Sequence, residues 1–200
     1  MNHFEYDEKA LDHLRQQDVK LAKVIDDVGR IKRSIEPDPF KALISGIVSQ
    51  QISTKAAQTV FGRLQDLVGE VTPEKILAKT DDEIKSCGLS YRKVTYIKGI
   101  CEAVVHGELD LDGLSGLSDE EVIAKLVTLN GIGVWSAEML MIFSLQRPDV
   151  LSYGDLIIRK GLMKLHGLDD LSKQDFAKYK ERYSPYGSIA SFYLWELANE

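Results

Sequence analysis

The stretch LNGIGVWSAEMLMIFSLQRPDVLSYGDLIIRK, residues 129–160, opens with a short glycine-containing turn between two segments that have helical patterns. Before the turn, Ser118 and Glu121 are spaced as in a capping box, which marks the start of a helix. After the turn, residues 134–145 are apolar on nearly all sides, which predicts a buried helix that stops before Pro148. The stretch therefore predicts two helices joined by a tight turn.

The turn carries two glycines, Gly131 and Gly133, two positions apart. Glycine allows a sharp turn, and because it has no side chain it lets another backbone approach closely. The helix that follows from Val134 then presents outward N–H groups at its positive end. We expect this helix start to bind an anion.

An aspartate, Asp155, follows Gly133 by 22 positions (155 − 133) and opens a third helical pattern. Together, LNGIGVWSAEML and this aspartate resemble the helix-hairpin-helix and Gly/Pro-Asp signature of the base-excision DNA glycosylase superfamily (HhH-GPD). They are most similar to its 3-methyladenine DNA glycosylase II (alkylbase) branch. Many DNA-binding proteins carry a hairpin alone, so the aspartate at this spacing makes the resemblance specific. It covers about residues 40–195.

The resemblance implies an all-α fold, a two-lobed helical bundle with a cleft between the lobes. One lobe would comprise about residues 1–38 and 148–200, and the other about residues 39–147, with the hairpin over 118–145. Together they would form a single glycosylase domain over the whole chain. The helical periodicity agrees with this expectation, since the sequence has no convincing series of strands.

Apolar residues recur at helical spacing through most of the chain. They predict one or two amphipathic helices over residues 7–29, a helical region over residues 40–67 and helix starts near Thr72 and Thr80. The last apolar helix, near residues 189–198, is expected to pack on the first ones.

Another helix is predicted after Asp155. Leu156, Ile157 and Leu162 give it a buried face. Gly167 is expected to end it.

The composition limits the classes of protein to which the chain can belong. It has 200 residues, 44% of them hydrophobic, which is enough for one sizeable core, and a net charge of −6. That charge argues against a protein that coats nucleic acid nonspecifically. Cys87 and Cys101 lack the spacing of a disulfide framework or a zinc site. Some relatives hold an iron–sulfur cluster with four cysteines near the C-terminus, which this chain lacks, so we expect no cofactor.

Neither a signal region nor an apolar run long enough to span a bilayer is evident in the sequence. We therefore expect an intracellular protein without membrane association, in the cytoplasm or nucleoid, or in the nucleus of a eukaryote. We also expect it to act as a monomer.

Two amides, Gln50 and Gln51, interrupt the apolar face of the region over residues 40–67. One interpretation is a pair of hydrogen-bonded polar residues at a helix kink or break. The resemblance implies instead that a glutamine here lies near the damaged strand, so Gln51 would contact the base pocket or the duplex. The sequence leaves open which of the two amides does so.

A basic segment without acidic residues runs from Ile84 to Cys101. Such a helix start is often only a solvated face. In the functional interpretation, Arg92 and Lys93 contact DNA phosphates beside Ser90. The resemblance implies that a bulky residue on this loop enters the duplex where the base has left, and Tyr91 falls on that position.

The candidate catalytic residue is Asp155. An aspartate at a helix start is most often an N-cap, and the helix dipole stabilises its charge. The resemblance implies a second role, in which the carboxylate stabilises the positive charge that develops on deoxyribose as the C1′–N bond breaks. Relatives that also cut the strand use a lysine at the second residue after Gly-x-Gly, and here that residue is Trp135. No Schiff base forms by this route, so we expect hydrolysis alone.

The resemblance also implies a base pocket, for which the candidates are Trp135, Met139, Tyr186 and Gln51. An aromatic face attracts a cationic alkylated base more than its neutral parent. By its pattern alone, Trp135 would be a core residue. Met139 stands where a bacterial relative has a second aromatic residue, and Gly187 stands where relatives often have an arginine, so the range of substrates stays open.

The hairpin is expected to anchor double-stranded DNA that contains a damaged base. Backbone N–H groups of Gly131, Gly133 and Val134 would bind phosphates and carry no sequence information. The family implies a monovalent cation at carbonyls of the turn, for which Leu129 and Ile132 are the candidates.

The sequence thus predicts a monofunctional DNA N-glycosylase that flips out alkylated purines such as 3-methyladenine and 7-methylguanine. Two alternatives stay open. The chain could act on another lesion, an oxidised or deaminated base. It could also be a noncatalytic helix-hairpin-helix DNA-binding module, in which Asp155 is only a cap.

Overall fold

The computed structural model describes residues 2–199, and this part of the chain is all-α apart from one pair of short strands. The strands, β1 (Asn2–His3) and β2 (Ser34–Ile35), pair antiparallel. The chain divides into two compact units, described here one at a time. Unit 1 comprises Met1–Ile35 and Met141–Glu200, and unit 2 comprises Glu36–Leu140.

The boundaries of these units differ slightly from those expected from the sequence, which fell at residues 38/39 and 147/148. The second boundary lies within helix α9 (Val134–Phe143) and not after it. The helix therefore begins in unit 2 and ends in unit 1.

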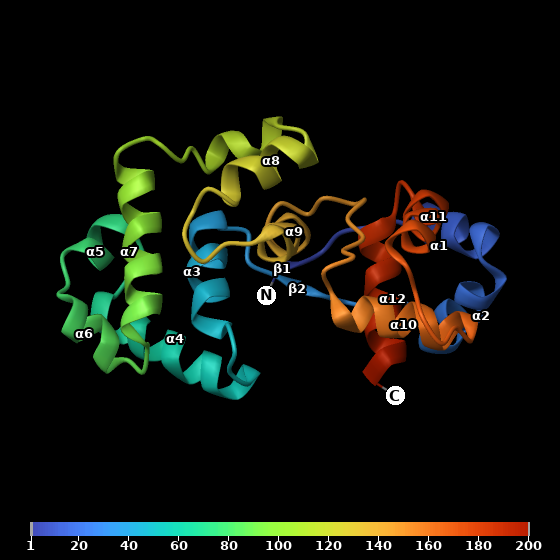
Figure 1. The fold of residues 1–200 in the computed structure, drawn as a ribbon, viewed down its shortest axis with the longest axis horizontal. Helices are drawn as coiled ribbons and strands as arrows, with labels where there is room; N and C mark the ends of the chain where they lie inside the picture. Colours follow the sequence, from blue (N-terminus) through green and yellow to red (C-terminus); the bar gives the residue numbers. More distant parts are fainter. Residues whose placement is uncertain (1, 200) are drawn as a thin grey trace. The chain divides into compact units, whose positions relative to one another are not determined.

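Unit 1 is built around its last helix, α12 (Figure 1). Its helices are α1 (Glu8–Gln17), α2 (Val19–Val28), α10 (Leu156–His166), α11 (Lys173–Tyr183) and α12 (Gly187–Asn199). The fully buried rings of Phe192 and Tyr193 lie on α12, which contacts α1, α2, α10 and α11. The expected return of the last helix onto the first ones is therefore confirmed.

Close packing of α10 on α12 depends on Gly161. A Cβ at this position would overlap the backbone carbonyl of Leu194, so the two helices approach more closely than a side chain would permit. Phe192, which also lies on α12, packs edge-to-face on Phe4, with ring centroids 5.1 Å apart. These contacts pack α10 and the N-terminal segment on α12 in the core of unit 1.

Unit 2 consists of helices packed around α7 (Figure 1). They are α3 (Pro39–Ser49), α4 (Thr54–Val68), α5 (Pro73–Leu77), α6 (Asp81–Ser86), α7 (Tyr91–Val105), the 3₁₀ helix η1 (Asp112–Gly116) and α8 (Asp119–Leu126). Helix α7 contacts α3, α5 and α6. The capping box that Ser118 and Glu121 predicted is present at the start of α8.

Two expectations about burial are wrong. Leu156 and Ile157 were predicted to lie in the core, but these residues are 51% and 37% exposed, and Ile158, Gly161 and Leu162 form the buried face of α10. The first turn of α9 was expected to be buried, yet Val134 is 53% exposed. An apolar pattern cannot distinguish a core face from an apolar surface, because both have the same spacing.

None of the helices between residues 2 and 199 combines the length and apolar character that crossing a lipid bilayer requires. This finding concerns only the described part of the chain.

Candidate functional site

The turn between α8 and α9 is held against α7 by one aromatic ring. Gly131 has a φ of +90°, a conformation that side chains rarely adopt, and a Cβ there would overlap the ring of Tyr96. Ile132 is 6% exposed and anchors the turn in the core of unit 2. At Gly131, the missing side chain thus makes room for a residue of this chain.

The second glycine of the turn differs from the first. Gly133 does not have a positive φ and is exposed, and apart from its neighbours along the chain no atom lies within 4 Å of where a Cβ would be. The expectation that both glycines serve the sharp turn therefore holds only for Gly131. Gly133 leaves open space at the exposed start of α9, where Val134 is the first helical residue.

The side chain of Gln50 links the end of α3 to the turn. Its Nε2 donates a hydrogen bond to the carbonyl oxygen of Gly131, at 2.8 Å. The ammonium group of Lys93 donates to the carbonyls of Val48 and Gln50, at 2.8 and 2.7 Å. Burial lowers the pKa of this lysine. The interpretation of Gln50 as a hydrogen-bonded residue at a helix break is therefore confirmed.

The short connection between α3 and α4 projects two exposed side chains. Gln51 has a φ of +58°, an unusual conformation for a residue other than glycine, and is exposed. Ile52, which the sequence analysis did not single out, is 40% exposed. The sequence pattern that could have identified Ile52 is an apolar residue directly after two amides at a helix break.

The residue expected on a loop, Tyr91, is instead the first residue of α7, so that detail of the prediction is wrong. Ser90 is the N-cap and accepts the N–H of Lys93. Tyr91 is 53% exposed, but its hydroxyl donates to Asp82 at 2.5 Å. The ammonium of Lys85 lies 4.2 Å from the ring centroid. The side chain is thus held back against α6.

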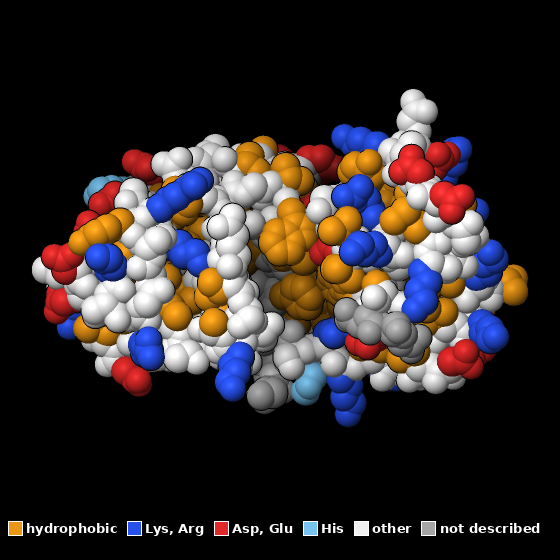
Figure 2. All heavy atoms as spheres, turned by 60° about the horizontal axis from the view of Figure 1, so that its bottom comes forward, with side chains coloured by type: hydrophobic (Ala, Val, Ile, Leu, Met, Phe, Trp, Pro, Cys, Tyr) orange, Lys and Arg blue, Asp and Glu red, His pale blue; other side chains and the backbone are white. Residues whose placement is uncertain are grey.

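Several charges of the basic segment are paired within unit 2. Lys98 forms an ion pair with Asp81 at 2.6 Å, and Lys93 binds the α3 carbonyls. Arg92 is exposed, lies over the ring of Tyr96 and donates to its hydroxyl. Figure 2 shows lysine and arginine side chains scattered among acidic ones over the surface that it draws. Arg92 and Lys85 are the exposed cations of this segment that have no carboxylate partner among the described residues.

In unit 1, Asp155 is the N-cap of α10. Its Oδ1 accepts the N–H groups of Ile157 at 2.8 Å and Ile158 at 3.0 Å. The residue is only 6% exposed. A buried carboxylate at a helix start is stabilised by the helix dipole and by two charge-assisted hydrogen bonds. The capping role is therefore present, and it is compatible with a second role.

The segment that leads to Asp155 is fixed by the start of α12. The buried hydroxyl of Ser188 accepts the N–H of Val150 at 2.9 Å and donates to the carbonyl of Arg147 at 2.6 Å. Asp149 accepts the N–H of Gly187 at 3.0 Å. These bonds set the path of the chain just before the cap.

The glycine at position 187, which departs from the family pattern, has a structural explanation. A Cβ there would lie 3.0 Å from Oδ1 of Asp149 and 3.3 Å from the backbone nitrogen of Leu151. Both distances are tighter than most Cβ contacts, so this site favours glycine over arginine.

The candidate aromatic residues lie in different units. In unit 1, Tyr186 is half-buried and packs edge-to-face on His13, with ring centroids 5.3 Å apart. Trp135 is 46% exposed near the start of α9, so the core interpretation of this tryptophan is wrong. Met139, one turn later, is half-buried.

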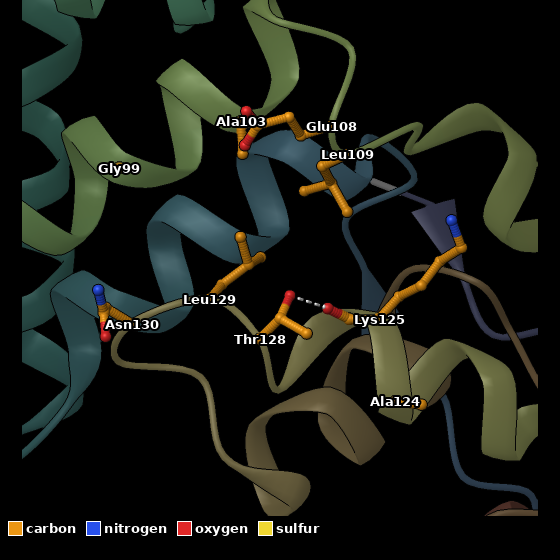
Figure 3. A pocket seen from close by; sticks show the side chains of 9 residues that line it. All are labelled: Gly99, Ala103, Glu108, Leu109, Ala124, Lys125, Thr128, Leu129 and Asn130. Atoms are coloured by element: carbon orange, nitrogen blue, oxygen red, sulfur yellow. Dashed lines mark hydrogen bonds between the residues drawn. The ribbon is translucent and has the colours of Figure 1, made fainter.

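Unit 2 also contains a cavity of about 620 Å³ beside the turn (Figure 3). It is lined by Gly99 and Ala103 of α7, by Leu109, and by Lys125, Thr128 and Asn130 with their neighbours. The hydroxyl of Thr128 donates to the carbonyl of Lys125 at 2.6 Å. None of the candidate base-pocket residues belongs to this lining.

A family model matches residues 44–185 of the chain, and its description is "HhH-GPD superfamily base excision DNA repair protein". A relative from Schizosaccharomyces pombe, DNA-3-methyladenine glycosylase 1, is 37% identical over 198 residues, which cover 95% of this chain and 87% of the relative.

Two solved structures are similar over nearly the whole chain. A DNA-3-methyladenine glycosidase from Bacillus halodurans is 38% identical, with a TM-score of 0.88, and the match covers 99% of this chain and 93% of that one. The 3-methyladenine DNA glycosylase of Schizosaccharomyces pombe, in complex with abasic DNA, is 37% identical. Its TM-score is 0.84, and the match covers 94% of this chain and 95% of that one.

Proposed function

This chain belongs to the HhH-GPD superfamily of base excision DNA repair proteins, and we propose that it is a DNA N-glycosylase for alkylated purines. Its substrates would be bases such as 3-methyladenine and 7-methylguanine in double-stranded DNA. The observation that carries the proposal is the 37% identity, over 95% of the chain, with DNA-3-methyladenine glycosylase 1. The buried carboxylate of Asp155 supplies the chemistry.

The proposed reaction is hydrolysis of the C1′–N bond. As the bond lengthens, the electron pair leaves with the base and the deoxyribose becomes cationic. The carboxylate of Asp155 stabilises this charge, and a water molecule then adds its oxygen to C1′ and releases one proton. A base alkylated at N3 of adenine or N7 of guanine already carries a positive charge, so it departs as a neutral base without a general acid. The products are the free base and an abasic site.

Strand cleavage is not part of this proposal. Trp135 occupies the second position after Gly131-Ile132-Gly133, where relatives with lyase activity have a lysine. An indole cannot form a Schiff base with the abasic sugar. Trp135 of unit 2 and Tyr186 of unit 1 each have an aromatic face that would attract a cationic base. Met139 and Gln51 are the further candidates for contacts with the base.

We assign the hairpin an anchoring role. Gly133 and Val134 are exposed residues at the positive end of α9, and their N–H groups would suit a phosphate. Arg92 and Lys85 would add charge on the same unit. The carbonyl of Leu129 accepts the Ile132 N–H at 3.1 Å and keeps a second lone pair that could bind the monovalent cation.

For the side chain that fills the space left by the flipped base, the structure supports Ile52 better than Tyr91. Ile52 is an exposed apolar side chain on the connection after the unusual Gln51, and a wedge between bases is usually apolar. Tyr91 would have to give up its hydrogen bond with Asp82 to enter the duplex.

The proposal is tested by incubating the protein with duplexes that each contain one defined lesion. Free bases are identified by mass spectrometry, and strands are analysed with and without hot alkali. We expect release of 3-methyladenine or 7-methylguanine, and strand breaks only after alkali. Release of only oxidised or deaminated bases would favour the alternative lesion class, and binding without any release would favour a noncatalytic DNA-binding module.

A further inference from the structure

The amide of Gln50 is turned toward the protein and not outward. Gln50 follows the last residue of α3, and its Nε2 reaches the carbonyl of Gly131, 81 positions away in the chain. This 2.8 Å bond connects the α3–α4 connection (residues 50–53) directly to the turn of the hairpin.

A second residue, Lys93, holds the same connection from α7. Its ammonium donates to the carbonyls of Val48 and Gln50 at the C-terminal end of α3. A cation is favourable there, because the end of a helix has unpaired carbonyls and the negative end of its dipole. Gln50 therefore accepts from Lys93 through its backbone and donates to Gly131 through its side chain.

The turn also lies directly against α7. The ring of Tyr96, on the same helix as Lys93, lies so close to Gly131 that a Cβ would overlap it. The backbone of Gly131 is thus fixed by the amide of Gln50 and by an aromatic ring of α7. All of these residues belong to unit 2.

Two exposed segments extend from this cluster. After Gln50 come Gln51 and Ile52, both exposed, and after Gly131 comes the exposed Gly133 at the start of α9. We infer that Gln50 and Lys93 are positioning residues that fix the α3–α4 connection to the hairpin. Building on the proposed function, they keep the segment that enters the base stack in a set position relative to the segment that holds the phosphates.

This coupling has a distinct consequence for base flipping. Phosphate binding by the hairpin needs only the hairpin, whereas flipping needs a side chain to enter the stack while the backbone is held. Loss of the link should therefore leave binding to intact DNA nearly unchanged and impair flipping. A residue that only stabilised the fold would affect both DNA binding and flipping, or neither of them.

The test compares Gln50→Met with Gln65→Met. Methionine keeps the length of the side chain but cannot donate a hydrogen bond, and Gln65 is an exposed glutamine on α4. Flipping is followed by the fluorescence of 2-aminopurine next to an abasic or alkylated site, and excision by single-turnover rate constants. We expect Gln50→Met to lower the rate of flipping and the single-turnover rate constant of excision by ~10- to 100-fold, the range typical of a displaced positioning group.

The affinity of Gln50→Met for an undamaged duplex should stay within about threefold, since independent sites contribute separately. Lys93→Met should show the same defect, and the double variant should be no worse than either single one. Equal losses of affinity and flipping, or wild-type flipping in Gln50→Met, would overturn the inference.

Amide hydrogen exchange gives a readout that does not depend on excision. In Gln50→Met, the amides of residues 131–133 should exchange at least ~10-fold faster than in the wild type and in Gln65→Met, because local opening becomes easier. Unchanged exchange would reject the coupling. If the wild type released no alkylated base while these amides still responded, the proposed function would fail and the coupling would stand.

Discussion

The ring of Tyr96 occupies the space where a side chain at Gly131 would lie. This relationship ties the hairpin to α7 and explains why the two glycines of the turn are not equivalent. Of these two glycines, Gly131 combines a positive φ with a crowded Cβ position, and Gly133 has neither.

The first prediction compares alanine at these two glycines. Gly131→Ala should lower the free energy of unfolding by about 2 kcal/mol or more, from backbone strain together with overpacking against Tyr96. Gly133→Ala should change it by less than about 0.5 kcal/mol, but its methyl group should weaken duplex binding at the start of α9. Chemical denaturation and DNA titrations check both. Equal stability losses would show that the local geometry is misassigned.

The second prediction concerns Ile52, the side chain proposed to fill the space left by the flipped base. Ile52→Ala should weaken binding to an abasic duplex by about tenfold more than binding to an intact one, because it removes apolar contact inside the stack. Tyr91→Ala should show a smaller difference, since its hydroxyl is already bound to Asp82. Fluorescence anisotropy with both duplexes measures the two variants. A larger selective loss for Tyr91→Ala would restore the assignment made from the sequence.

The third prediction tests the support of the catalytic segment. Ser188→Ala would leave the N–H of Val150 and the carbonyl of Arg147 without their buried partner. Unsatisfied buried groups should lower the free energy of unfolding by about 1–3 kcal/mol and reduce excision. Ser86→Ala, at an exposed serine on α6, is the control and should be within about 0.5 kcal/mol of the wild type. A Ser188→Ala protein that matches this control would contradict the assignment.

The fourth prediction is a pH dependence of stability that arises in unit 1. His166 lies 3.1 Å from Asp18 and 3.5 Å from the hydroxyl of Tyr183. Burial lowers the pKa of His166, although Asp18 opposes this effect. The folded protein therefore takes up the proton less readily than the unfolded chain. Stability should be full above the unfolded pKa of about 6.5 and fall as the pH drops through it.

Urea denaturation between pH 8 and pH 5 checks this dependence, with His166→Gln as the comparison. The variant keeps a hydrogen-bonding side chain but cannot be protonated in this range, so its stability should vary less with pH. An equally steep decline in the variant would assign the effect to other groups. The pKa of Asp18 is also lowered: burial opposes the shift, but hydrogen bonds from Tyr183 and from backbone N–H groups outweigh it. The loss of stability that follows from Asp18 belongs to more acidic pH.

The parts of the fold that depend on neighbouring residues could be predicted from the sequence. The capping box at Ser118, the cap at Asp155 and the stop at Gly167 are present where the local pattern placed them. Each of these features involves backbone groups within a few positions, so the information lies in the residues themselves.

Contacts between distant segments could not be predicted in this way. The bond from Gln50 to Gly131 joins residues 81 positions apart, and nothing in the local pattern indicates which amide turns inward. The same limit applies to Tyr91, whose position is set by Asp82 on another helix. The exposure of Trp135 near the start of α9 also depends on packing, because an apolar helix has the same sequence pattern whether its first turn is buried or exposed.

The central claim is that the charge of Asp155 drives departure of the base, and Asp155→Asn tests it most directly. Asparagine is as good an N-cap as aspartate, so the start of α10 and the melting temperature should be nearly unchanged. Single-turnover release of 7-methylguanine from a defined duplex should fall by about 10²- to 10³-fold, as expected when electrostatic stabilisation of the transition state is lost. Release at the wild-type rate by the folded variant would contradict the account.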